Sequence, residues 1–218
     1  MGQKINPTIF RLGPQYTWKS RWFASGKRYA ELLATDTKLR QALMKRLTNA
    51  GITEVEIERS LKSITIRLYV ARPGVVIGRG GTGIGELKEY VKQLLGVNSD
   101  DAQALRVDIP VEEVKHPDLN AHLVATKIAD QLVRRIPHRR VVHKTMDAVM
   151  AAGAKGVKII LGGRIGGAEI SRVEKYFLGS IPQQTIRADI DYAQVPALTR
   201  SGYVGVKVYI YKGEGTLS

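Results

Sequence analysis

The chain has 218 residues, of which 44% are hydrophobic, so it can hold one large domain or two small ones with buried cores. It carries 34 Lys and Arg against 20 Asp and Glu, and this net charge of +14 points to a polyanionic partner, nucleic acid before an acidic membrane surface. The absence of Cys excludes disulfides, thiolate zinc sites and a cysteine nucleophile.

The sequence carries no membrane signal. Its beginning, "MGQKINPTIF", lacks the apolar segment of a signal peptide. No stretch approaches the roughly 20 apolar residues that a membrane-spanning helix needs. We therefore expect a cytoplasmic protein without a membrane partner.

The first part of the chain, residues 1–34, is expected to be a basic arm. Residues 1–28 hold six basic side chains and no acidic one. Glycine and proline interrupt every hydrophobic period in this region, at Pro7, Gly13, Pro14 and Gly26. The arm is therefore predicted to be irregular and to contact a polyanion.

Regular patterns begin at Thr35. The segment "TDTKLRQALMKRLTNAG" has apolar residues at helical spacing, Thr35 or Asp36 as a cap and Gly51 as a stop. "ITEVEIERS" and "SITIRLYVA" each alternate apolar and polar residues, as half-buried strands do. A glycine loop, the helix "IGELKEYVKQLLG" and a strand in "QALRVDIPV" follow. The predicted order is helix, strand, strand, glycine loop, helix, strand.

The glycine loop in "VVIGRGGTGIG" matches two phosphate-binding motifs. Gly78, Gly80 and Gly83 satisfy G-x-G-x-x-G, the dinucleotide motif, whereas Gly78-Arg79-Gly80-Gly81 satisfies GxxG, an RNA-binding motif. The dinucleotide motif belongs directly after a strand, with an acidic residue about 20 positions further on. Here about one helical turn separates the strand from the glycines. An NAD-binding enzyme therefore remains the alternative, and GxxG is preferred.

The GxxG loop predicts a KH domain over residues 35–112. In a KH module two short helices flank the glycines, and the backbone of about four nucleotides passes close to the turn. Glycine leaves room for that approach, helix N–H groups face the phosphates, and Arg79 adds a positive charge. The additional helix and strand upstream are typical of the type-two KH domain of bacteria. The predicted RNA-binding residues are Gly78, Arg79, Gly80 and Gly81.

Residues 113–212 predict a second α+β domain, with residues 213–218 as a short tail. Two helical patterns, in "DLNAHLVATKIADQLVRRI" and after Pro137, precede four strand patterns. The strands are expected in "GVKIILGG", "AEISRVEKYF", "TIRADIDYA" and "YVGVKVYIYK". The fold class is therefore α+β: a basic arm, a type-two KH domain, and a domain of two helices and a four-stranded sheet.

The second helix of this domain is predicted to have a basic ridge. Residues 134–164 hold eight basic side chains and one acidic one. Four groups that are cationic or nearly so share one arc of the helix, and apolar residues occupy the opposite arc. The ridge consists of Arg139, Arg140, His143 and Lys144. A basic stripe can be merely solvated, but its density favours contact with nucleic acid.

Catalysis has little support in the sequence. The four His residues are dispersed without carboxylates at the spacing of metal ligands. Asp189 and Asp191 share one face of a predicted strand, which strand alternation explains as its polar face. We expect no catalytic residue, no bound metal and no cofactor.

Four segments resemble, in order, the family of bacterial small-subunit ribosomal protein three: "MGQKINPTIFRLG", "ARPGVVIGRGG", "GAKGVKIILGGRIGGAEISR" and "TIRADIDYA". The resemblance covers nearly the whole chain. It implies a structural protein of the small-subunit head that binds rRNA beside head proteins ten and fourteen. It also implies that the protein lines the mRNA entry channel and helps to unwind incoming message without ATP.

The resemblance also assigns residues. The entry-channel bases of the family correspond to Arg139 and Arg140, and the third base falls on His143. Because an unperturbed imidazole is mostly neutral at pH 7, either His143 or its neighbour Lys144 makes the third contact. Contacts with rRNA are expected at Lys4, Arg11, Arg134, Arg135, Lys155, Lys158 and Arg164. A stand-alone KH regulator that binds mRNA is the second alternative.

Overall fold

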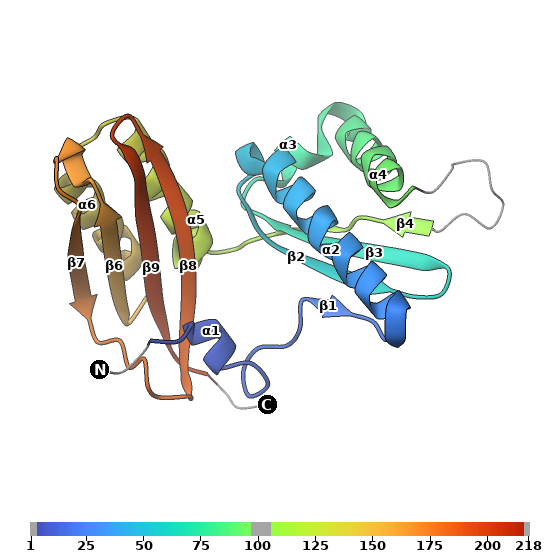
Figure 1. Ribbon diagram of the computed structural model, residues 1–218, viewed down its shortest axis with the longest axis horizontal. Coiled ribbons are helices and arrows are strands. Elements are labelled where there is room, and N and C mark those ends of the chain that lie inside the picture. Colours follow the sequence, from blue (N-terminus) through green and yellow to red (C-terminus); the bar gives the residue numbers. More distant parts are fainter. Residues whose placement is uncertain (1–3, 97–105, 216–218) are drawn as a thin grey trace. The chain divides into compact units, whose positions relative to one another are not determined.

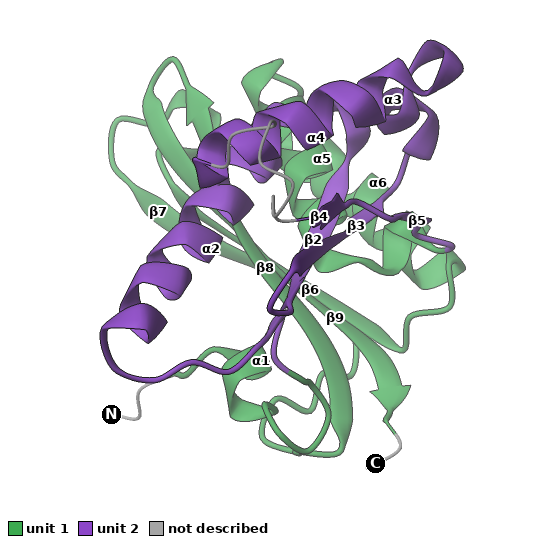
Figure 2. Cartoon of the chain, turned by 90° about the vertical axis from the view of Figure 1, so that its right-hand side faces the viewer, with its two compact units in different colours: residues 1–17, 116–218 green, residues 18–115 purple. Residues whose placement is uncertain are grey.

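The structure is a computed structural model that describes residues 4–96 and 106–215 (Figure 1). Residues 103–105 of the predicted third strand and residues 216–218 of the tail lie outside the described residues. The chain forms two compact units (Figure 2): unit 1 comprises residues 1–17 and 116–218, and unit 2 comprises residues 18–115. Each unit has its own sheet and its own hydrophobic core, which confirms the α+β class.

Unit 2 follows the predicted order of elements. Its strands form a sheet in the order β1-β2-β3-β4, and β5 also pairs with β3. Among the described strands of this unit, β2 and β3 pair antiparallel and the other pairs are parallel. The elements are β1 (Ser20–Arg21), α2 (Gly26–Arg46), β2 (Ile52–Arg59), β3 (Ser63–Val70), α3 (Pro73–Ile77), α4 (Thr82–Leu95), β4 (Arg106–Asp108) and β5 (Val111–Glu113).

The core of unit 2 lies between the helices and one face of the sheet. Alternate residues of β3 are buried, as its period of two predicts. They pack with Leu43 of α2 and with Leu87 and Val91 of α4 in one buried cluster. The opposite face of the sheet carries ion pairs instead, such as Arg67 Nε with Glu112 Oε1 at 3.1 Å. This packing holds α4, and with it the glycine turn at its beginning, against the sheet.

Helix α2 begins nine residues earlier than Thr35, at Gly26. Asp36 is therefore not a cap but a mid-helix residue, and its side chain is only 1% exposed. It accepts hydrogen bonds from Trp22 Nε1 and from Arg59 Nε, both at 2.7 Å. A buried carboxylate needs such partners, and these bind the segment before α2 to the body of unit 2.

Unit 1 has four antiparallel strands in the order β7-β6-β9-β8. Helices α5 and α6 cover one face of this sheet (Figure 1), and their apolar residues share its core. Strand β6 has the predicted bounds, whereas β8 and β9 are longer than their patterns indicated. The elements are α1 (Pro7–Phe10), α5 (Ala121–Val133), α6 (His138–Ala151), β6 (Gly156–Gly163), β7 (Arg172–Gly179), β8 (Ala188–Thr199) and β9 (Gly202–Glu214).

The expected arm of residues 1–34 is divided between the two units. Residues 1–17 belong to unit 1, where Arg11 is 0% exposed. Its guanidinium donates hydrogen bonds to five backbone carbonyls, among them those of Ala188 at 2.6 Å and Thr185 at 2.8 Å. Burial lowers the pKa of Arg11, and Tyr16 and Asp189 oppose that shift. The expected rRNA contact at Arg11 is wrong, because its donors are used inside the protein.

Candidate nucleic-acid interface

The glycine turn lies between two helices, as the KH prediction required. Helix α3 ends at Ile77 and is capped by Gly78, a 3-10 turn spans Arg79–Gly81, and α4 begins at Thr82. Gly78, Gly80 and Gly81 have φ values of 71°, 64° and 81°, which L side chains rarely adopt. This turn therefore depends on glycine for its backbone conformation.

The space around these glycines differs from one position to the next. A Cβ atom at Gly83 would lie 2.5 Å from the carbonyl oxygen of Val76, so close packing of α3 and α4 requires glycine there. A Cβ at Gly80 or Gly81 would meet no atom within 4 Å. The backbone at Gly80 and Gly81 is thus exposed to solvent and can be approached by a ligand.

The beginning of α4 adds a partial positive charge to the exposed turn. In the described structure no side chain caps this helix end, so its first N–H groups have no side-chain acceptor. Arg79 is exposed beside them. The glycines follow a helix, whereas a dinucleotide fingerprint follows a strand. The turn is therefore suited to an extended phosphate backbone.

The ridge on α6 has the two faces that its spacing predicted. Arg139, Arg140, His143 and Lys144 are all exposed. The opposite side of the helix packs in the core of unit 1 through Val141, Val142, Thr145, Met146 and Val149. The ridge is consequently held on a rigid helix with its polar groups in solvent.

Strand β7 supplies partners to this ridge that the helical pattern could not reveal. The ring of His143 contacts Tyr176 edge-on, with centroids 5.8 Å apart. Glu174 accepts a hydrogen bond from the Tyr176 hydroxyl at 2.5 Å and lies 3.0 Å from His138 Nε2. The pKa of Glu174 is held below its ordinary value, first by the hydrogen bond from Tyr176 and then by the nearby His138, Arg172 and Arg139. The charge of Arg139 is thus partly balanced by Glu174, while Arg140 and Lys144 form no ion pair within the described residues.

The expected rRNA contacts in unit 1 do not form one surface. Lys4 and Lys158 lie with Lys175 on the sheet face opposite the helices. Lys158 Nζ lies 5.8 Å from the ring centre of Tyr209, and its pKa is lowered by burial, then by Lys4 and Lys175. Lys155 is exposed immediately before β6.

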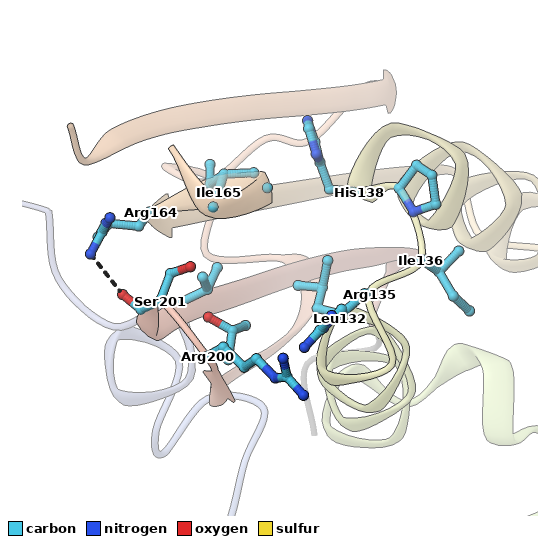
Figure 3. A pocket seen from close by; sticks show the side chains of 13 residues that line it. Leu132, Arg135, Ile136, His138, Arg164, Ile165, Arg200 and Ser201 are labelled. Carbon is cyan, nitrogen blue, oxygen red and sulfur yellow. Dashed lines mark hydrogen bonds between the residues drawn. The ribbon is translucent and has the colours of Figure 1, made fainter. Parts of the chain in front are cut away.

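The remaining three contacts, Arg134, Arg135 and Arg164, are exposed around the end of α5 and the turn after β6. Arg135 and Arg164 line one cavity together with Arg200 (Figure 3). Sequence reasoning missed Arg200, whose only signal was a basic residue in the turn "TRSG" between two predicted strands.

Other chemistries find no support in the part of the chain that the structure describes. Within the described residues, 4–96 and 106–215, no three His, Asp or Glu side chains are grouped so that they could hold a metal ion. No described helix combines the length and hydropathy of a membrane span. Asp189 accepts a hydrogen bond from Tyr16, and Asp191 accepts one from the backbone of Ala121, so both carboxylates have structural partners.

Comparison with known families and proteins covers both units. Residues 38–119 match the KH domain family, and residues 128–210 match the family described as ribosomal protein S3, C-terminal domain. The chain is 47% identical to small ribosomal subunit protein uS3 of Persephonella marina, over 98% of this chain and 91% of that protein. Identity is 48% with uS3 of Desulfosudis oleivorans and 49% with uS3 of Synechocystis, again over 98% of this chain and over 96% and 87% of the relatives.

Proposed function

The chain belongs to the uS3 family of small ribosomal subunit proteins, and we propose that it acts in the small subunit by binding RNA, without catalysing a reaction. It is a KH-domain protein of the small subunit. We infer that it works in the cytoplasm, within the ribosome, and contacts rRNA with both units. Head proteins ten and fourteen are its proposed neighbours, on the strength of the family resemblance.

The glycine turn of unit 2 is the proposed contact for single-stranded RNA. Its support is the open space at Gly80 and Gly81, next to uncapped N–H groups of α4 and the exposed Arg79. A phosphate at this position would accept hydrogen bonds from the backbone and an ionic contact from one guanidinium. Recognition of this kind follows the chain of the RNA rather than its base sequence.

The ridge on α6 is the proposed contact for mRNA entering the ribosome. The observation that carries this proposal is the exposure of Arg139, Arg140, His143 and Lys144 on a helix whose other side is fixed in the core. Cationic groups held on a rigid element can grip a phosphate chain at low entropic cost. Such a grip would bias base pairs in the message towards opening and needs no ATP.

The test is translation by assembled ribosomes that carry alanine at Arg139, Arg140 and Lys144. We expect passage through a stable mRNA hairpin to be slower by about tenfold, which corresponds to a loss of about 1.4 kcal/mol of binding free energy over the three contacts. Translation of an unpaired message should change little. The matched control carries lysine at Arg139 and Arg140, which keeps both charges and most of the rate. Equal slowing on both messages would assign the ridge to rRNA and contradict the proposal.

A further inference from the structure

Unit 1 contains a cavity that the proposed RNA contacts do not explain. It has a volume of about 590 Å³, which is within the range of roughly 300–1,000 Å³ that small-ligand sites occupy. It lies among the end of α5, the start of α6, the turn after β6 and the β8–β9 turn (Figure 3). Three stretches that are distant in sequence, residues 132–138, 164–167 and 199–204, therefore converge on one cavity.

The lining of this cavity combines three guanidinium groups with an apolar wall. Arg135, Arg164 and Arg200 come from three different segments. None of the residues described around the cavity is acidic, and no ion pair among the described residues engages these three arginines. The apolar wall is formed by Leu132, Ile136, Ile165 and Val204. Three unpaired cations beside apolar side chains favour an anionic ligand that also has an apolar part.

Arg135 occupies a backbone position that normally favours glycine. It follows the C-cap Arg134 of α5 and has a φ of 61°, the one positive value of a non-glycine residue in the described chain. The Arg135 N–H donates to the Leu132 carbonyl, and the Ile136 N–H donates to the Gln131 carbonyl. These two bonds form a Schellman motif, in which glycine is the usual residue at the left-handed position. An arginine there costs stability, which indicates a use for its side chain.

Arg164 is held in place by the protein itself. Its Nε donates to the Ala168 carbonyl at 2.8 Å, and its Nη1 donates to the Ser201 carbonyl at 3.4 Å (Figure 3). These bonds use two of the five guanidinium N–H donors. The bond to Ser201 also connects the turn after β6 to the β8–β9 turn that carries Arg200. The cavity wall is therefore organised before any ligand arrives.

We propose that this cavity binds one unpaired nucleotide of an RNA chain. The base packs against the apolar wall and the guanidinium planes, and the adjoining phosphates bind Arg135, Arg164 and Arg200. A base within a duplex could not enter, since it would remain stacked and paired. The proposal rests on the proposed RNA-binding function and adds the form of RNA that unit 1 recognises.

The test uses the full chain and two RNA hairpins that contain one 2-aminopurine, bulged in the first hairpin and paired in the second. We expect Arg200→Ala to weaken binding of the bulged hairpin about tenfold, because one charge-assisted contact is lost. Binding of the paired hairpin should weaken much less. Arg187→Ala is the matched control, because it removes an exposed arginine of unit 1 outside the cavity. It should weaken both hairpins slightly and equally.

Arg135→Gly provides a second variant that should fold at least as well as the unmodified chain, because glycine is the favoured residue at this left-handed position. It should also lose preference for the bulged hairpin. Equal losses for both hairpins in the Arg200 and Arg187 variants would overturn the nucleotide site while leaving RNA binding intact. Saturable binding of free uridine monophosphate without a preference for the bulged hairpin would assign the cavity to a free nucleotide, and this too would overturn the proposal. Absence of binding to either hairpin by the unmodified chain would overturn the RNA-binding function itself.

Discussion

The two units contain turns of nearly the same backbone conformation with opposite surroundings. In the 3-10 turn Arg79–Gly81 of unit 2, Gly80 has φ and ψ of 64° and 18°. In the 3-10 turn Ile165–Gly167 of unit 1, Gly166 has 65° and 16°. A second left-handed glycine follows in both turns. The difference is at the first residue, since Arg79 is exposed and Ile165 is 1% exposed.

The surroundings of the two turns differ in the same sense as this first residue. In unit 2 the glycines face open space and precede a helix, so the backbone itself is available. In unit 1 Ile165 anchors the turn in the core, and a Cβ at Gly166 would lie 3.7 Å from His138 Nδ1. That turn lines the cavity, and the ligand contacts proposed there come from arginine side chains. The same local conformation thus belongs to a proposed backbone site in one unit and to a proposed side-chain site in the other.

The largest expected effect comes from shortening the first residue of each turn. Ile165→Ala should lower the free energy of unfolding of unit 1 by about 2–5 kcal/mol, because it leaves a cavity in the core. Arg79→Ala should change that of unit 2 by less than about 0.5 kcal/mol, because its side chain is exposed. Hydrogen exchange of β6 amides reports unit 1, and fluorescence of Trp18 and Trp22 reports unit 2. Similar losses of unfolding free energy in both units would contradict the difference described between the two turns.

A second effect should be confined to unit 2. Gly83→Ala places a Cβ against the Val76 carbonyl and should cost about 1–3 kcal/mol in urea unfolding followed by tryptophan fluorescence. Gly85→Ala, in the same helix with no atom within 4 Å of its Cβ, is the control. It should stabilise unit 2 by about 0.5–1 kcal/mol, because alanine favours helix over glycine. If Gly83→Ala is neutral, the two helices do not depend on this contact.

The next prediction concerns RNA. Gly80→Asp should reduce affinity for a single-stranded oligonucleotide at least about tenfold, since it adds a side chain and a negative charge where a phosphate would lie. Gly96→Asp introduces the same charge at another exposed left-handed glycine, with a φ of 66°. Filter binding with both full-length variants should show a much smaller loss for Gly96→Asp. Equal losses would mean that only the net charge matters.

The smallest expected effect is an increase in stability. Arg135→Gly should raise the free energy of unfolding of unit 1 by up to about 1 kcal/mol, because glycine adopts the left-handed conformation without strain. Arg134→Gly removes the same charge from the preceding residue, whose φ of −74° is ordinary. That control should be neutral or destabilising. A loss of stability in Arg135→Gly would show that this arginine supports the fold rather than a ligand.

The sequence predicted those features that depend on local periodicity. The short apolar run "GVKIILGG" placed β6 at its observed bounds, and helical spacing separated the ridge of α6 from its buried side. The spacing Gly78–Gly81 was sufficient to place the turn between two helices. Each of these features is determined by side chains within a few residues of one another.

Features that depend on distant partners could not be predicted. Arg11 is buried by carbonyls more than 170 residues away along the chain, and nothing near it distinguishes it from a surface base. From the sequence Asp36 is predicted to be a helix cap, and only the fold shows that Trp22 and Arg59 donate hydrogen bonds to it. Arg200 joins the cavity only because the β8–β9 turn lies beside the end of α5. Long-range packing decides all three.

The contrast between a backbone site and a side-chain site is tested most directly by the salt dependence of RNA affinity. Counterions are released when Lys or Arg neutralises a phosphate, so each such contact contributes roughly 0.7–0.9 to the slope of log affinity against log salt. Titrations of the full chain with the bulged hairpin should therefore give a slope smaller by roughly 0.7–0.9 for Arg200→Ala. For Gly80→Ala, measured with the single-stranded oligonucleotide, affinity should fall equally at every salt concentration and the slope should not change. A reduced slope in Gly80→Ala, or an unchanged slope in Arg200→Ala, would contradict the account.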